Sequence, residues 1–426
     1  MQKVKECLVS LMLLVSVLLP SVFAQNEISL PYSRYGVGII NNNVPGTLHA
    51  MGGVSYAMQS NLYINFTNPA SYVAFDSLSF IADVAFNIVS STLRTNELSQ
   101  RGTYARASYI TIGLPVTRRW RTSVGFLPFS DRGYDIVDAK EYDEIGNVRY
   151  EYLGDGGMMQ LYWGNAFKIC KGLSIGLNAS YIFGRFTSER YVEFDEDYYY
   201  NYRIAQTDLS DGIYLQAGLQ YFANINENHR LGIGVVYENS AYIWSKRSEL
   251  VNHYVGEYNE VIVYDTTSLV PSDKGKMKIP QSAGGGLSYC YKDKILVGAD
   301  FTWQNWSKYS NMGRGDSLKD ACIAKIGLQY IPDPTSGKFG KNIAYRIGAK
   351  FSTGYIKLRN TPVDEWAVTV GIGLPLRSYT TKCSMNIMFE YGGMGTLNHN
   401  LIRQNYFKFG FNFILQERWY QRVKLE

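Results

Sequence analysis

Apolar and polar residues alternate strictly near the C-terminus of the 426-residue chain. Residues 405–415 read NYFKFGFNFIL, with phenylalanine at four alternate positions beginning with Phe407. The positions between them carry Lys408, Gly410 and Asn412. Successive side chains of a β-strand point to opposite faces of the sheet. The pattern therefore predicts a strand with one aromatic face and one polar face.

The same alternation recurs along the chain and predicts fourteen strands. Their approximate spans are residues 77–87, 104–114, 119–129, 157–168, 173–186, 211–225, 229–241, 277–292, 294–305, 320–332, 342–353, 363–375, 382–392 and 403–416. Most of these spans exceed the ~5–6 residues that are common in globular sheets. Their length suits strands that cross a membrane at a tilt.

The connections between the predicted strands alternate between long and short in the first half of the chain. The long ones are residues 88–103, 130–156, 187–210 and 242–276, and the short ones are residues 115–118, 169–172 and 226–228. Barrels of the outer membrane have short periplasmic turns and longer extracellular loops. The rhythm therefore predicts an outer-membrane barrel.

The polar faces of these strands indicate where the lumen is. In residues 342–353, Arg346 and Lys350 lie opposite a face that includes Ile347 and Phe351. A charge facing lipid at the bilayer midplane costs roughly 2–4 kcal/mol in a barrel strand, so the polar face must line the interior. The predicted fold class is an all-β, transmembrane antiparallel β-barrel of about fourteen strands.

The N-terminal residues 1–24 have the pattern of a secretory signal peptide. Lys3 and Lys5 precede the apolar residues 8–19, and small residues lead to a predicted cleavage site after Ala24. An uncleaved membrane anchor is the alternative, but the apolar run is short for a span. Export through this signal predicts localisation in the outer membrane of a Gram-negative bacterium.

Residues 25–75 do not continue the strand pattern. They are rich in Gly, Asn and small residues, and they precede the predicted barrel of residues 76–426. A fourteen-strand barrel encloses more space than its own side chains fill. We therefore expect residues 25–75 to fold into the lumen as a plug.

Residues 51–72, MGGVSYAMQSNLYINFTNPASY, resemble the N-terminal hatch of the FadL/TodX-type outer-membrane transport proteins. The matching positions are Gly52, Gly53, Ala57, Asn68, Pro69 and Ala70. Residues 278–289, 298–309, 345–351 and 371–376 are also similar to that family. The resemblance implies a fourteen-strand barrel, plugged by an N-terminal hatch, that passes long-chain fatty acids or aromatic hydrocarbons.

The resemblance further implies lateral diffusion of the ligand through a gap beside a kinked third strand. The third predicted strand contains Gly125 and Pro128. Proline cannot donate a hydrogen bond to a neighbouring strand, so a local opening there is physically reasonable. The alternative is that Pro128 simply ends the strand at the extracellular rim.

Five charged residues alternate with the lipid-facing positions of their predicted strands and are therefore expected, by this parity, to face the lumen: Arg121, Asp300, Lys325, Arg346 and Glu390. A cation among them could bind the carboxylate of a fatty acid. Mixed charges in a barrel interior also suit a structural network that holds the plug. Both interpretations remain open from the sequence.

Other kinds of function find little support in the composition. The net charge is only +5 without a basic cluster, so we expect no nucleic-acid partner. The cysteines lack metal-ligand spacing, and the four histidines are isolated, so we expect no metal, cofactor or catalytic residue. Whether any cysteines pair is left open.

Two functions follow from these patterns. The first is an outer-membrane channel for small lipophilic molecules, with membrane lipid and a small hydrophobic ligand as partners. The second is a plugged barrel that serves as a structural subunit of an outer-membrane secretion or barrel-assembly complex. The tyrosine-rich residues 187–210 and 242–276 would then contact other outer-membrane proteins through extracellular loops.

Overall fold

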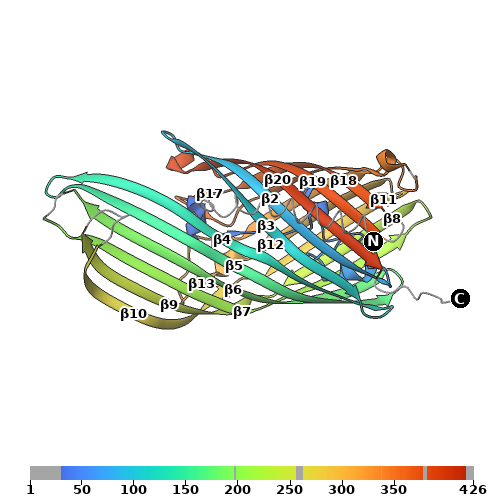
Figure 1. Ribbon diagram of the computed structural model, residues 1–426, viewed down its shortest axis with the longest axis horizontal. Coiled ribbons are helices and arrows are strands. Elements are labelled where there is room, and N and C mark those ends of the chain that lie inside the picture. Colours follow the sequence, from blue (N-terminus) through green and yellow to red (C-terminus); the bar gives the residue numbers. More distant parts are fainter. Residues whose placement is uncertain (1–29, 196–197, 256–261, 337, 378–380, 419–426) are drawn as a thin grey trace, which may run out of the picture.

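The computed structural model describes residues 30–195, 198–255, 262–336, 338–377 and 381–418 (Figure 1). Within this part of the chain, the strands form a closed antiparallel barrel in which β2 pairs with both β3 and β20. Fourteen strands make up the wall, as the alternation predicts. Residues 1–24, the predicted signal peptide, lie outside the described residues.

The wall strands follow one another around the barrel in chain order. They are β2 (Ser79–Arg94), β3 (Ser99–Pro115), β4 (Trp120–Tyr142), β5 (Gly146–Cys170), β6 (Leu173–Phe194), β7 (Asn201–Asn224), β8 (His229–Glu238), β9 (Ala241–Val255), β10 (Ile262–Ile279), β11 (Ser282–Tyr291), β12 (Ile295–Gln304), β14 (Ala321–Tyr330), β15 (Ala344–Ser352), β18 (Glu365–Arg377), β19 (Thr381–Met394) and β20 (Arg403–Arg418). The smaller elements are η1 (Pro31–Arg34), β1 (Ile39–Ile40), α2 (Gly46–His49), η2 (Pro69–Ala74), η3 (Trp306–Lys308), β13 (Ser310–Asn311), η4 (Phe339–Asn342), β16 (Lys357–Leu358), β17 (Thr361–Pro362) and η5 (Asn398–Asn400).

Two of the fourteen barrel strands are interrupted. One consists of β8 and β9, since β7 pairs with β8 over its C-terminal half and with β9 over its N-terminal half. The other consists of β10 and β11, which pair in turn with β9 and β8. Pro280 stands at the break between β10 and β11, where it offers no N–H to the ladder. Opposite it, the Ser240 hydroxyl donates a hydrogen bond to the Ile279 carbonyl.

The outer and inner faces of the wall agree with the predicted alternation. Phe407 is 64% exposed on the outer face, whereas Asn412 of the same strand is buried inside. Ile347 and Phe389 are likewise exposed, and Glu390 is buried. Among the described residues, no helix is long and apolar enough to cross a membrane.

One side of the barrel is much taller than the other, which the sequence does not predict. The described parts of residues 130–156, 187–210 and 242–276 were expected to be loops, but they are mostly extensions of β4 to β7 and the β9–β10 hairpin. Figure 1 shows these strands projecting beyond the rest of the wall at one end. Above the lipid, no apolar face is required, so the period-two signal fades although the strands continue.

The N-terminal segment, residues 30–75, runs through the inside of this wall. The Gly46 N–H donates a hydrogen bond to the Tyr109 hydroxyl of β3 (2.6 Å), and the Gly52 N–H donates one to the Thr369 hydroxyl of β18 (2.8 Å). The Tyr72 hydroxyl donates to the Asn178 side chain of β6 (3.0 Å). Because these strands lie on different sides of a closed sheet, the segment lies within the barrel.

Candidate functional site

A compact ionic cluster joins α2 of the N-terminal segment to the inner wall. The Glu390 carboxylate of β19 is fully buried and lies 2.5 Å from His49 Nε2. Lys350 Nζ and Lys408 Nζ lie 3.3 Å and 3.7 Å from the same carboxylate. Lys350 also pairs with Glu365 at 2.8 Å. The two lysines and two glutamates balance in charge, which makes burial of the group tolerable.

The Asp300 carboxylate fixes the next part of the N-terminal segment. Its Oδ2 atom accepts hydrogen bonds from the Ser55 N–H (2.6 Å) and the Tyr56 N–H (3.0 Å). A carboxylate that accepts two backbone N–H groups is held strongly in place. Asp300 is therefore a structural anchor of residues 55 and 56.

Arg121 of β4 holds the C-terminal end of the N-terminal segment, just before β2. Its Nε donates to the Phe75 carbonyl (3.1 Å) and its Nη2 to the Ser77 hydroxyl (3.1 Å). Beside it, burial raises the pKa of the Asp76 carboxyl. The hydrogen bond from Asn61, the positive charge of Lys382 and hydrogen bonds from Lys382 and Gln416 outweigh this effect and lower the pKa below its ordinary value. The segment thus enters β2 through a polar clamp.

The two remaining predicted cations differ from each other. Arg346 of β15 donates to the Gln329 side chain of the neighbouring β14 (2.7 Å) and to the Asn386 side chain of β19, two strands away on the other side (2.8 Å). Lys325 has no hydrogen bond or ion pair within the described residues, and its ammonium lies 5.9 Å from the centre of the Tyr56 ring. Of the five charged residues predicted from parity, Lys325 alone faces the cavity described below.

The predicted hatch motif owes its composition to close approach between the segment and the wall. Gly52 has φ +70°, and a Cβ there would lie 2.7 Å from backbone atoms of β14 and β15. Its neighbour Gly53 also has positive φ, +79°. Both values favour glycine.

Asn68, Pro69 and Ala70 form the start of η2. The Asn68 side chain accepts a hydrogen bond from the Ala70 N–H (3.1 Å) and donates one to the Tyr56 carbonyl (2.7 Å). Asparagine therefore caps the helix, and proline occupies the first position, where no N–H is needed. Gly218 of β7 leaves room for the Asn68 side chain, because a Cβ there would lie 2.1 Å from it.

The wall is incomplete between β3 and β4. Pairing of these strands ends at Ile110 and Phe126. Beyond that point, among the described residues, β3 pairs with β2 alone, and β4 pairs with β5 and briefly with β1. β4 has a register shift between Pro128 and Ser130 and then continues to Tyr142. The alternative that β4 ends at Pro128 is therefore wrong.

Gly125, the other predicted kink residue, belongs to the last part of β4 that still pairs with β3, opposite Thr111 and next to the separation. A Cβ at Gly125 would meet the Tyr162 ring at 2.4 Å, so this glycine lets an aromatic ring of β5 cover β4 from inside. The structure thus brings Gly125 and Pro128 together at the place where β3 and β4 part.

The N-terminal segment closes this separation. β1 pairs with β4, with Ile40 opposite Ser130. Arg106 of β3 forms an ion pair with Asp131 of β4, and the Asn41 amide donates to the same carboxylate (2.7 Å). The gap is therefore bridged by β1 and by polar side chains rather than by backbone pairing between β3 and β4. No short sequence pattern indicated Arg106, Asp131 or Asn41.

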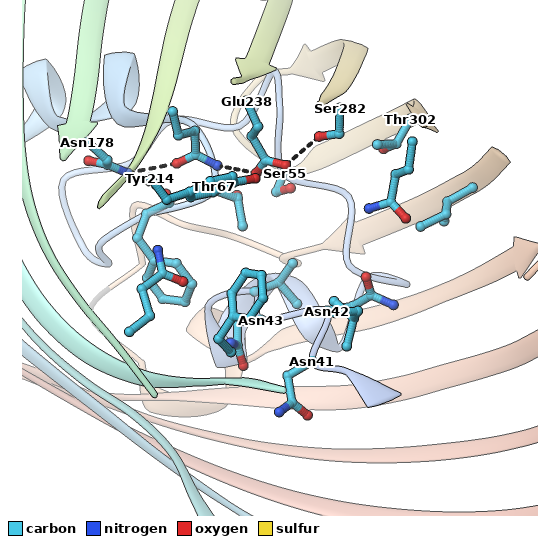
Figure 2. Close-up of a pocket in the computed structure, with 18 of the residues that line it drawn as sticks. Asn41, Asn42, Asn43, Ser55, Thr67, Asn178, Tyr214, Glu238, Ser282 and Thr302 are labelled. Carbon is cyan, nitrogen blue, oxygen red and sulfur yellow. Dashed lines mark hydrogen bonds between the residues drawn. The ribbon is translucent and has the colours of Figure 1, made fainter. Parts of the chain in front are cut away.

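A cavity of about 130 Å³ adjoins the closed gap on the lumen side. Its polar lining includes Asn41, Asn42, Asn43, Gln160, Asn178, Gln216, Glu238, Ser282 and Lys325, and its apolar lining includes Leu127, Phe129, Ile279, Trp306 and Ile323. Hydrogen bonds join the side chains of Asn178, Gln216, Glu238 and Ser282. Figure 2 shows Asn178, Glu238 and Ser282 along one side of the cavity. Such a lining suits a molecule with both polar and apolar parts.

Among solved structures, the barrel is similar in fold to the following three proteins. The CymD monoaromatic hydrocarbon channel is 13% identical and aligns over 89% of this chain and 99% of its own, with a TM-score of 0.54. A Pseudomonas aeruginosa FadL homologue is 12% identical over 90% and 100%, with a TM-score of 0.56. The Pseudomonas putida toluene transporter TodX is 13% identical over 89% and 99%, with a TM-score of 0.54.

These likenesses define the fold class: an antiparallel β-barrel with the FadL/TodX fold, as the resemblance in sequence predicts. A family profile described as BamG matches residues 3–426. The chain therefore belongs to the BamG family. A search of curated proteins found no match.

Proposed function

We propose that the protein is an outer-membrane channel that admits a small lipophilic molecule, with the N-terminal segment as its hatch. The observation that carries this proposal is the separation of β3 and β4, which in the described part of the chain is closed by β1 and a few polar side chains. Movement of the segment away from β4 would join the 130 Å³ cavity to the lipid phase. The similar fold of the hydrocarbon channels CymD and TodX supports this function.

The lining of the cavity favours an amphipathic ligand over a plain hydrocarbon. An enclosed apolar cavity of about 150 Å³ can hold benzene, so the size allows a small ring or the head of a longer molecule. Lys325 supplies a cation without an ion-pair partner among the described residues. We propose that it binds the carboxylate of a fatty-acid-like ligand, whose chain leaves between β3 and β4.

Binding of palmitate and of its uncharged methyl ester tests this assignment. Lys325→Met is expected to weaken palmitate binding about tenfold, because a charge-assisted hydrogen bond is lost, and to leave methyl palmitate binding unchanged. Fluorescence titration of the purified protein measures both. Lys246→Met, an exposed lysine of β9, is the matched control. Equal palmitate binding by wild type and Lys325→Met would remove Lys325 from the site, and binding of neither probe by wild type would contradict the transport proposal.

A second candidate function is a structural subunit of an outer-membrane secretion or barrel-assembly complex. The tall wall favours it, since β10 between Ile262 and Gly275 pairs only with β9 within the described residues. An unpaired strand edge can accept a strand of another protein. Near the tip, Tyr200 and Tyr264 stack at 4.5 Å and both are exposed.

Native mass spectrometry of the protein extracted gently from outer membranes separates the two functions. A single chain that carries a small lipophile is expected if the protein is a channel. A stable heteromer without a ligand, lost in the double variant Tyr200→Ser/Tyr264→Ser, would instead establish the subunit role. These two tyrosines are exposed, so their replacement should not unfold the barrel.

A further inference from the structure

Three arginines gather on the outer surface where β2, β3 and β20 rise above the lipid-facing aromatic residues. Arg94 of β2 and Arg403 of β20 are directly opposite each other in the ladder. Arg101 of β3 is opposite Thr92, two residues before Arg94. All three arginines are exposed. The function proposed above does not use them.

The strand alternation places these arginines on the lipid side of the wall. Along β20, Arg403 follows the same face as Phe407 and Phe409, which are exposed toward lipid. Along β2, Arg94 follows the face of Ile88. Four residues of a strand span roughly 13 Å, so Arg403 lies about that far along β20 from Phe407. Arg403 therefore lies at the level of the lipid headgroups, at the end of the barrel where the β2–β3 tip is found.

These guanidinium groups lack carboxylate partners. Among the described residues none of the three forms an ion pair. Arg101 Nε donates to the Ser90 hydroxyl and Arg403 Nε to the Asn405 side chain, each at 3.3 Å. Arg94 and Arg403 face each other as like charges, which destabilises a strand pair. An anion between them would remove this repulsion.

Two acidic side chains at this end of the barrel do not neutralise the arginines. Glu97 lies in the β2–β3 tip and Asp364 just before β18, and neither forms an ion pair in the described part of the chain. The cluster therefore keeps its positive charge toward the membrane surface.

A surface cavity of about 250 Å³ opens beside Arg403. Trp366 of β18 and residues 393–398 line the rest of it. Trp366 is 39% exposed and packs edge-on against Tyr391 at 5.6 Å, and Tyr391 in turn contacts Phe407 at 4.6 Å. Tryptophan and tyrosine of membrane proteins concentrate at the level of the headgroups. The cavity thus lies just above the lipid-facing aromatic residues.

We propose that this rim binds the phosphorylated headgroup of a glycolipid of the outer leaflet. The guanidinium groups of Arg94, Arg101 and Arg403 would bind phosphate, for which arginine has a matching planar array of donors. A sugar ring would occupy the cavity against Trp366. The acyl chains would lie along Phe407, in continuity with the lipid-facing surface. This continuity favours a lipid over a soluble phosphate.

Binding of diphosphorylated lipid A to the detergent-purified barrel tests the proposal. Arg94→Gln/Arg403→Gln is expected to bind it at least about tenfold more weakly than wild type, because charged hydrogen bonds are lost. Lipid A without phosphates should bind both proteins equally weakly. Arg190→Gln, an exposed arginine on the tall part of β6, is the matched control and should bind like wild type.

Several outcomes would overturn the proposal. They are equal lipid A binding by wild type and the double variant, an equal loss in Arg190→Gln, or displacement of lipid A by millimolar inorganic phosphate alone. Trp366→Leu provides an independent variant, expected to weaken lipid A binding while keeping the arginines. Heat-modifiable mobility on gels verifies that each variant is a folded barrel.

Discussion

Glu390→Gln is expected to lower the free energy of unfolding by about 3–5 kcal/mol, the cost of breaking a buried ion pair by removing one partner. The carboxylate is fully buried and contacts His49, Lys350 and Lys408. It also accepts a hydrogen bond from the Tyr406 hydroxyl (2.8 Å). Glutamine keeps the shape but not the charge, so two lysines would share Glu365 alone. Urea unfolding of the barrel refolded in lipid vesicles measures the loss.

Lys382→Met is the control for this experiment. Lys382 pairs with Asp76 at 3.3 Å, and both side chains are substantially exposed. An exposed ion pair contributes about 0–1 kcal/mol, so this variant should be nearly as stable as wild type. If Glu390→Gln lost no more stability than Lys382→Met, the cluster around Glu390 would not stabilise the position of α2.

The strands and their faces could be predicted because lipid imposes them. Every second residue of a membrane strand must be apolar, and the Phe407 series shows this without any knowledge of the partner strands. The same rule places Glu390, Lys325 and Arg346 in the lumen. Where the wall leaves the lipid, the constraint ends, and the extensions of β4 to β7 were mistaken for loops.

The contacts inside the lumen could not be predicted in the same way. His49 and Glu390 are 341 residues apart in the chain, and no local pattern links them. Parity assigned Arg346 and Lys325 to the same face, but it could not show that Arg346 is satisfied by two amides while Lys325 faces a cavity. Side-chain partners across a barrel depend on strand order and register together.

The Asn68–Pro69–Ala70 motif lies between these two cases. Its helix-start character is local, since asparagine caps η2 and proline follows it. Its fit against Gly218 depends on how the segment lies in the barrel. The sequence could therefore locate the motif, and only the structure gives the reason for each residue.

A disulfide between β1 and β4 is expected to abolish passage of a ligand through the gap. Ile40 and Ser130 are ladder partners, so their Cα atoms have a separation that a disulfide can bridge. In a chain whose other cysteines are replaced by serine, oxidised Ile40→Cys/Ser130→Cys should lower uptake of radiolabelled palmitate by cells more than about tenfold, because a covalent bond prevents β1 from leaving β4. Reduction of the same variant should restore uptake.

Lys278→Cys/Ser310→Cys is the matched disulfide for this experiment. These residues are ladder partners of β10 and β13, and neither belongs to the N-terminal segment. Its oxidised form should take up palmitate like the serine-substituted parent. If the oxidised β1–β4 disulfide also left uptake unchanged, the ligand would not pass between β3 and β4 by displacement of β1. If both disulfides blocked uptake, a general stiffening of the wall, rather than the position of β1, would account for the loss.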